Sequence, residues 1–324
     1  MSANLIEVKH LKKYFYQGND PFKKKEAIKA VDDVSFFIKR NEVLGLVGES
    51  GCGKTTCGKL ILRLINPTSG SIFFNGHDIT YLKPKQMAEF RRKMMIIYQD
   101  PFGSLDPRMT IGAAIAEPME VHKIFSTKEE KENKIIELME KVGLTSDQIN
   151  RYPHEFSGGQ RQRIGIARAL ATNPTFIVAD EPVSALDVSI QAQIINLLKN
   201  LQKDFDLTLL FITHNLSVIK HTSDRIAVMY AGELVELASK QDLFRDPLHP
   251  YTKALLSAIP IPDPEFQTKY IPLAGEIPSL IHPPPGCRFH PRCTQMKPEC
   301  SKTKPELREV KKDHFVTCYP YSFK

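Results

Sequence analysis

Residues 43–56 read VLGLVGESGCGKTT, an apolar run that leads into a glycine-rich segment ending in Lys-Thr-Thr. The segment matches the eight-residue pattern of a phosphate-binding loop, and a helical stretch with Leu60, Ile61 and Leu64 follows it. Glycines let backbone amides turn toward a phosphate with no Cβ in the way, and the helix presents the positive end of its dipole. The sequence therefore predicts a nucleotide site after a buried strand, Val43 to Val47.

The polar residues of the loop have expected roles. Lys54 is expected to reach the β- and γ-phosphates, Thr55 to bind Mg²⁺ and Thr56 to contact the α-phosphate. The other loop residues expected to surround the phosphates are Gly48, Ser50, Gly51 and Gly53. Cys52 and Cys57 are interpreted as packing or loop residues and not as reactive thiols. GTPases, kinases and many ATPases share such a loop, so it does not distinguish among them.

The composition limits the class of protein. With 42% hydrophobic and 25% charged residues over 324 positions, the chain is predicted to be globular and longer than one core usually serves. The net charge of +7 suits phosphate ligands or an anionic membrane surface and is too small for a nucleic-acid tail. No apolar run approaches the roughly 20 residues of a membrane span, and the first residues lack a secretory pattern. We therefore expect the protein to lie in a reducing cytoplasm, where its cysteines would not form disulfides.

Proline content marks a boundary along the chain. Of 23 prolines, 14 lie between Leu243 and Lys324, so this tail is not expected to be mainly helix or central strand. Earlier residues alternate short apolar runs with helical patterns, which is typical of an α/β sheet covered on both faces. The predicted elements are strands at 5–9 and 34–38, a polar excursion at 18–25 and a helical subdomain at about 100–160.

One helix of that subdomain has both ends marked in the sequence. Ser126 and Glu129 fit a capping box, and Gly143 fits a C-terminal stop. Apolar residues recur at helical spacing between them, so the sequence predicts an ordinary amphipathic helix.

A second apolar run, Phe176 to Ala179, ends in the adjacent carboxylates Asp180 and Glu181. Ligands bind at the carboxyl ends of parallel strands, and a carboxylate there can hold the Mg²⁺ that accompanies a nucleotide. We expect Asp180 in that role and expect Glu181 to polarise the attacking water as a general base. Such a pair is common at strand ends, but the phosphate loop upstream favours the functional interpretation.

Between these elements lies the pentapeptide Phe156 to Gln160, which reads FSGGQ and opens a helix. The chain here resembles the ATP-binding cassette (ABC) family, whose signature is LSGGQ. Further family motifs occur in order within residues 5–243, and the positions they identify are Gln99 in MIIYQ, Asp187 in SALD and His214 after LLFIT. Phe15 in LKKYF aligns best with the aromatic that stacks on adenine, with Tyr14 or Tyr16 as alternatives.

The resemblance implies a fold and a mechanism. The fold is the α/β P-loop NTPase core of an ABC ATPase, with an antiparallel β subdomain and a helical insertion. Water held by Glu181 and His214 would attack ATP in line, while Gln99 would contact Mg²⁺ and couple the site to a transmembrane subunit. In the family, Ser157 and Gly159 of one subunit close over the nucleotide of another, so the active unit is expected to be a head-to-tail dimer.

The C-terminal tail indicates which subgroup of the ABC family the chain resembles. Segments beginning at His249, Gly275 and Gly286 look like the C-terminal extension of the peptide and nickel import ATPases. This implies an ABC nucleotide-binding domain at 1–245 and an importer extension at 246–324. The subunit is then expected at the cytoplasmic face of the membrane, where ATP and Mg²⁺ energise uptake of oligopeptides or dipeptides. Expected partners are transmembrane permease subunits, a paralogous ATPase or a second copy, and, indirectly, an extracytoplasmic peptide-binding protein.

The tail contains four cysteines, separated by five, six and seventeen residues, at Cys287, Cys293, Cys300 and Cys318. None forms the short Cys-x-x-Cys pair typical of structural zinc, whereas four thiolates at loop spacing suit a cubane iron–sulfur cluster. Some members of the resembling subfamily carry a 4Fe-4S cluster here, so that cluster is the first expectation, zinc the second and uncoordinated thiols the third. Because the tail lacks an alternating strand pattern, a metal is expected to supply much of its folding energy.

Two other functional classes use an ATP-binding fold. A soluble ABC ATPase acting on nucleic acid or the ribosome is disfavoured, because the sequence has one cassette and no clustered basic surface interleaved with aromatics. A metal- or redox-sensing module would not need Glu181 and His214, which indicate catalysis. No nucleic-acid partner is therefore expected.

Overall fold

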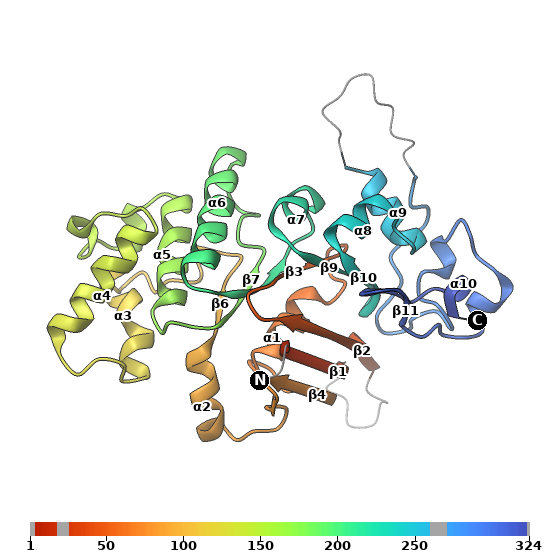
Figure 1. Cartoon of the computed structure of the whole chain (residues 1–324), viewed down its shortest axis with the longest axis horizontal. Helices are drawn as coiled ribbons and strands as arrows, with labels where there is room; N and C mark the ends of the chain where they lie inside the picture. Colours follow the sequence, from red (N-terminus) through yellow and green to blue (C-terminus); the bar gives the residue numbers. More distant parts are fainter. Residues whose placement is uncertain (1–3, 18–25, 260–270, 323–324) are drawn as a thin grey trace. The chain divides into compact units, whose positions relative to one another are not determined.

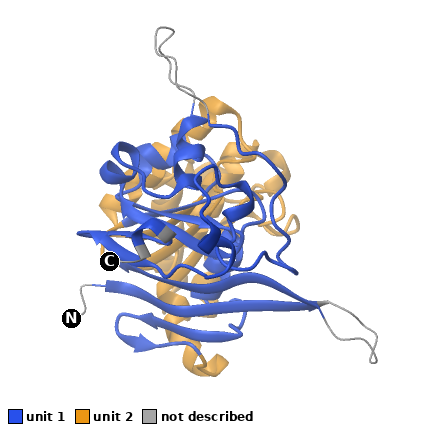
Figure 2. Cartoon of the chain, turned by 90° about the vertical axis from the view of Figure 1, so that its right-hand side faces the viewer, with its two compact units in different colours: residues 1–38, 43–80, 213–324 blue, residues 39–42, 81–212 orange. Residues whose placement is uncertain are grey.

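A computed structural model describes residues 4–17, 26–259 and 271–322. The chain forms two compact units, coloured separately in Figure 2: unit 1 comprises 1–38, 43–80 and 213–324, and unit 2 comprises 39–42 and 81–212. Each unit has its own strands and helices (Figure 1). The predicted excursion at 18–25 lies outside the described residues.

Unit 1 contains a four-stranded sheet in the order β2-β1-β4-β5. Its strands are β1 (Asn4–Gln17), β2 (Glu26–Lys39), β4 (Ser69–Phe74) and β5 (His77–Asp78). β4 pairs antiparallel with both β1 and β5, which confirms the predicted antiparallel subdomain. β1 and β2 have 14 residues each and are longer than predicted, because backbone pairing continues past the apolar runs into polar sequence.

A second set of strands in unit 1 follows the order β11-β12-β10-β9-β3. They are β3 (Val43–Val47), β9 (Arg225–Tyr230), β10 (Glu233–Ser239), β11 (Arg308–Lys311) and β12 (His314–Val316). β3 lies parallel to β9 and is buried at every residue, as its apolar sequence predicts. The neighbours β9–β10, β10–β12 and β12–β11 pair antiparallel.

The tail contains the strands β11 and β12, although its sequence lacks an alternating strand pattern. Phe315 lies opposite Leu237 and Val316 opposite Glu236, so the tail extends the sheet from β10. Strands of four and three residues are too short to show a clear alternation, and pairing with an existing strand stabilises them. The tail is therefore joined to the sheet of unit 1 through backbone pairing.

The helices of unit 1 are short. They are α1 (Lys54–Ile61), α7 (Leu216–Thr222), α8 (Lys240–Arg245), α9 (Pro250–Ser257) and α10 (Tyr319–Ser322), with 3₁₀ turns η3 (His290–Arg292) and η4 (Pro298–Ser301). The helix α1 follows the phosphate loop, as predicted, but it ends at Ile61. Leu64 lies beyond the helix and is 46% exposed.

Unit 2 contains three parallel strands in the order β8-β7-β6. They are β6 (Met94–Ile97), β7 (Phe176–Asp180) and β8 (Thr208–Ile212). The helices are α2 (Pro84–Lys93), α3 (Ile111–Val121), α4 (Lys128–Lys141), α5 (Gly158–Leu170) and α6 (Val188–Asp204), with 3₁₀ turns η1 (Ser146–Gln148) and η2 (Pro153–Glu155). α3, α4 and α5 pack against one another and form the predicted helical insertion (Figure 1).

Helix α4 begins one residue later than predicted. Thr127 Oγ1 accepts a hydrogen bond from the Glu130 amide at 3.2 Å, and Glu130 Oε2 accepts one from the Thr127 amide at 3.3 Å. Two adjacent hydroxyl residues precede the helix, and a sequence pattern does not distinguish which of them caps it. Gly143 follows the helix with a φ of 76°, as expected of a C-terminal stop. Among the described helices, none is both long and apolar enough to cross a bilayer.

Candidate active site

The phosphate loop joins β3 to α1 in unit 1, and glycine is required at both of its ends. Gly53 has a φ of 103°, and a Cβ there would lie 2.1 Å from the Ala30 carbonyl oxygen. Gly48 has a φ of 154°, and a Cβ there would lie 2.2 Å from the Met229 carbonyl oxygen. No side chain caps α1, which suits a helix N-terminus that binds an anion.

Lys54 lies inside this loop with only 5% of its surface exposed. Its Nζ donates to the carbonyl oxygen of Gly48 at 2.9 Å and to that of Glu49 at 3.0 Å. A phosphate oxygen is a stronger, charged acceptor than either carbonyl, so Lys54 is placed to exchange partners when a nucleotide binds. Burial raises the pKa of Cys52, and burial raises the pKa of Cys57 to about 12, so both thiols are protonated packing groups.

The carboxyl end of β7 in unit 2 holds the two predicted carboxylates. Asp180 is the last residue of the strand and is 5% exposed, and Glu181 follows it with a φ of 45°. Such a left-handed conformation is costly for a residue other than glycine and clusters at functional sites. The Glu181 amide donates to the Ile212 carbonyl at 2.9 Å, and its carboxylate accepts from Gln99 Nε2 at 3.3 Å. The fold therefore brings together Gln99 and Glu181, which are far apart in sequence.

Ser157 is the N-cap of α5, as the signature predicts. Its hydroxyl accepts a hydrogen bond from the Gln160 amide at 3.3 Å, and Gln160 Oε1 accepts one from the Ser157 amide at 3.0 Å. Ser157 is exposed, whereas Gly159 is buried so tightly that a Cβ would lie 2.5 Å from Ile190 Cγ2. The helix end is thus a rigid, solvent-facing group of donors that can bind an anion.

The other predicted residues lie at the ends of helices and strands. His214 is exposed directly after Thr213, and the next residue, Asn215, caps α7 through its side chain. Asp187 is the exposed N-cap of α6. Unit 1 carries His214, Phe15 and the loop residues Gly48, Ser50, Gly51, Gly53, Lys54, Thr55 and Thr56. Unit 2 carries Gln99, Ser157, Gly159, Asp180, Glu181 and Asp187.

The three aromatic candidates for stacking on adenine differ in exposure. The Tyr14 hydroxyl donates to Asp32 Oδ1 at 2.5 Å, and burial together with this bond raises the pKa of Tyr14. Phe15 is 39% exposed with Lys13 Nζ 4.9 Å from its ring centre, and Tyr16 is 61% exposed. Tyr14 is therefore fixed by its own hydrogen bond, and Phe15 and Tyr16 keep accessible rings.

Comparisons with known proteins agree with this geometry. The sequence profile of the ABC transporter family matches residues 31–184, and that of the oligopeptide/dipeptide transporter C-terminal region matches residues 235–300. The oligopeptide transport ATP-binding protein OppF of Bacillus subtilis (strain 168) is 51% identical over 325 residues, which cover 100% of this chain and 99% of that protein. This chain belongs to the ABC transporter ATPase family. The resemblance seen in the motifs is thus confirmed.

Two further matches support the family assignment. The oligopeptide transport ATP-binding protein AppF of the same organism is 51% identical over 322 residues, which cover 98% of both chains. A solved dimeric post-hydrolysis state of the ATP-binding cassette MJ0796, bound to ADP and Pi, matches with a TM-score of 0.65 and 29% identity. That match covers 72% of this chain and 98% of the other.

The four cysteines of the extension do not form the predicted metal site. Over the described ranges, which include all four, no three or more His, Cys, Asp or Glu side chains are placed to hold a metal ion. Burial, more than the neighbouring sulfurs of Cys300 and Cys293, raises the pKa of Cys287 to about 11. Burial likewise raises the pKa of Cys293. The described residues therefore give no geometric support for a metal site on these four cysteines.

Two contacts of the phosphate loop have no signal in the sequence motifs. Glu49 bonds to Tyr251, 202 positions along the chain, and to Arg292, 243 positions along. No motif relates positions so far apart, and the pattern GESGCGKT leaves the residue after its first glycine unspecified. The sequence gives one hint of such contacts: Arg288 and Arg292 are basic residues beside the tail cysteines and can pair with a carboxylate.

Proposed function

We propose that this ABC ATPase hydrolyses ATP to energise the import of oligopeptides or dipeptides. The observation that carries the proposal is end-to-end identity of about half its residues with oligopeptide transport ATP-binding proteins, extension included. A nucleotide loop with a buried lysine and a strained glutamate beside Gln99 support ATP hydrolysis. The extension that we assign to residues 246–324 separates this subgroup from shorter cassettes.

The predicted site residues have distinct proposed roles. Lys54 and the loop amides would hold the phosphates. Glu181 and His214 would hold the attacking water, with Glu181 as its general base. The Thr55 hydroxyl, the Gln99 amide and the buried Asp180 carboxylate are oxygen donors of the kind Mg²⁺ prefers, and the ion would supply charge neutralisation at the phosphates. Gln99 is already bonded to Glu181, so it is placed to orient that base.

We also propose that the active unit is a pair of cassettes. The exposed N-cap Ser157, the exposed Asp187 and the 82% exposed Val188 that follows it support a partner surface on unit 2. The related cassette MJ0796 was solved as a dimer with ADP and Pi. The second cassette would be a paralogous ATPase or another copy, and Ser157 and Gly159 would contact the nucleotide that it holds.

Permease subunits are the proposed membrane partners, which would place this ATPase peripherally on the cytoplasmic face of the membrane. The ring of Phe102, three residues after Gln99, is 58% exposed, and Tyr152 is 41% exposed. Exposed aromatic rings suit contact with a partner such as a transmembrane subunit. An extracytoplasmic peptide-binding protein would act indirectly by delivering the peptide.

Peptide uptake by reconstituted vesicles tests this function. Substituting Lys54→Ala removes a charged hydrogen bond to the phosphates, so we expect MgATP affinity and peptide uptake to fall about tenfold to a hundredfold. Lys59→Ala, on the same helix α1, is the matched control and should leave both unchanged. ATP-driven transport that ignores Lys54→Ala, or tight salt-dependent binding of nucleic acid, would point to another function.

A 4Fe-4S cluster on Cys287, Cys293, Cys300 and Cys318 is also proposed, with zinc as the second choice. Its support is the family resemblance and the proximity of three of the thiols, whose charges would interact. Protein expressed anaerobically with iron is expected to be brown, with broad absorbance near ~400 nm from the cluster. A colourless protein with one bound zinc would favour zinc, and a protein with neither metal would agree with the arrangement described.

A further inference from the structure

Glu49 of the phosphate loop is held at three points. Its carbonyl oxygen accepts from Lys54 Nζ at 3.0 Å, and its amide donates to the Tyr251 hydroxyl at 3.0 Å. Its carboxylate accepts from Arg292 Nη1 at 2.9 Å through Oε2 and at 3.2 Å through Oε1. Two of the three partners, Tyr251 and Arg292, belong to the C-terminal extension. The extension therefore contacts the same residue that contacts the lysine of the loop.

The Arg292 side chain is held by further contacts besides the one with Glu49. Its side chain is 7% exposed, its Nε donates to the Ala274 carbonyl at 3.3 Å, and its Nη1 also donates to the Tyr230 hydroxyl at 3.4 Å. The Glu49 side chain is 20% exposed, so water screens this ion pair little. An Arg–carboxylate contact to both oxygens sets orientation as well as distance.

An aromatic cluster supports both extension residues. The Tyr251 ring centre lies 4.6 Å from that of Tyr230 and 5.5 Å from that of Phe289, and Tyr230 and Phe289 meet edge to face at 5.2 Å. Tyr251 and Tyr230 are at most 1% exposed, and Phe289 is 2% exposed. Packed rings in this arrangement leave the Tyr251 hydroxyl a single position, beside the Glu49 amide.

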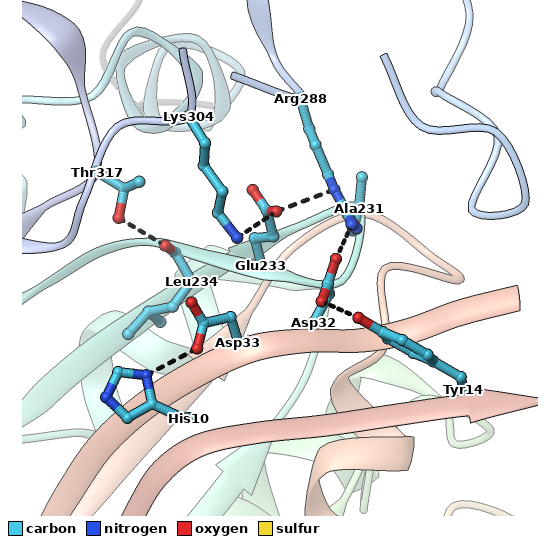
Figure 3. A network of polar contacts seen from close by, with 10 residues as sticks. All are labelled: His10, Tyr14, Asp32, Asp33, Ala231, Glu233, Leu234, Arg288, Lys304 and Thr317. Carbon is cyan, nitrogen blue, oxygen red and sulfur yellow. Dashed lines mark hydrogen bonds and ion pairs between the residues drawn. The ribbon is translucent and has the colours of Figure 1, made fainter. Parts of the chain in front are cut away.

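Arg292 ends a short segment, residues 288–292, and Arg288 anchors the other end of it (Figure 3). It pairs with Asp32 of β2 and donates to the Ala231 carbonyl, and its Nε lies 3.0 Å from Glu233, which also binds Lys304 at 2.8 Å. The side chains of Arg288 and Asp32 are 5% and 12% exposed. The segment from Arg288 to Arg292 is thus attached to β2 at one end and to the phosphate loop at the other.

We propose that Arg292 and Tyr251 are positioning residues of the phosphate loop, through which the C-terminal extension sets the affinity for MgATP. The inference rests on the proposed ATPase function. Arg292 neutralises a carboxylate next to the loop that must receive a polyanion, and Tyr251 fixes the backbone of the same residue. Without Arg292, Glu49 would keep its charge, repel the phosphates and release the loop from its fixed position.

The test compares ATP kinetics of full-length variants in the assembled transporter. Arg292→Gln is expected to raise the KM for MgATP about tenfold while kcat changes less than about threefold. The substitution affects how the phosphate loop binds MgATP before the reaction and leaves the hydrolytic step itself intact. Arg292→Lys should be intermediate. Adding Glu49→Gln to Arg292→Gln removes the uncompensated charge, so the KM should return to within about threefold of wild type. Arg308→Gln, a half-exposed arginine paired only with Glu306 in the contacts seen, is the control.

Two results would overturn the proposal: an unchanged KM in Arg292→Gln, or a raised KM that Glu49→Gln does not repair. If Arg292→Gln does not fold, Tyr251→Phe and Arg292→Lys decide, and wild-type KM values in both would refute the proposal. A wild-type transporter that fails to hydrolyse ATP would instead contradict the proposed function. Normal wild-type turnover with an unaffected Arg292→Gln counts against this inference alone.

Discussion

Substituting Glu181→Gln is expected to lower the ATP hydrolysis rate by about 10²- to 10⁴-fold, the usual contribution of a general base. The amide keeps the size and the contact with Gln99 but loses the negative charge that attracts the proton of the attacking water. The left-handed backbone at Glu181 is held by main-chain bonds, so the substitution should not disturb the fold. Hydrolysis of MgATP by the assembled transporter measures this effect.

ATP binding should persist in the same variant. The loop residues that hold the phosphates are unchanged, so ATP affinity should stay within about twofold of wild type and the nucleotide should remain intact. Glu137→Gln removes a carboxylate that pairs with Lys134 on α4 and serves as the control. Near-normal hydrolysis by Glu181→Gln would remove Glu181 from the role of base.

Substituting Ser157→Arg is expected to lower hydrolysis by about 10²- to 10³-fold, comparable to the loss of a preorganised group that stabilises transition-state charge. The exposed serine would contact the nucleotide of the other cassette, and a long side chain there would prevent closure. Because Ser157 does not belong to the chain's own phosphate loop, ATP affinity of the isolated chain should not change. Unchanged ATP binding together with slower hydrolysis is the result expected of a residue that acts on a partner's nucleotide.

Thr127→Arg provides a closely matched control. Thr127 caps α4 with the same reciprocal hydrogen bonds that Ser157 makes at α5, and both helices belong to unit 2. Loss of the cap should cost each variant about 1 kcal/mol of stability, so any extra effect of Ser157→Arg reflects function. If both variants lost activity equally, Ser157 would be only a structural cap.

The parts of the fold that the sequence predicted correctly are local. The strand, loop and helix around Lys54 follow one another without interruption, and β3 is buried at every residue as its composition indicates. The signature placed Ser157 at a helix N-terminus because capping depends on neighbouring residues only. Such features are determined within a few residues, and a pattern can reveal them.

The features that escaped prediction depend on distant segments. β12 exists because it pairs with β10, and Arg292 matters because folding brings it to Glu49. The cysteine spacing predicted a metal site, but spacing alone does not determine where side chains lie, and the described structure does not assemble one. Long-range pairings of this kind become visible only in the folded structure, because no local property of the sequence encodes them.

If ATP joins two cassettes through Ser157, the Glu181→Gln protein should double its molar mass when ATP is added, as measured by light scattering. The measurement is made on the chain alone and on the chain mixed with a paralogous ATPase. ATP should convert Glu181→Gln from one cassette to a stable pair, and adding Ser157→Arg should abolish pairing while ATP still binds. A Glu181→Gln protein that binds ATP and stays single in both settings would show that ATP does not join two cassettes. A double variant that pairs equally well would show that Ser157 does not take part in pairing.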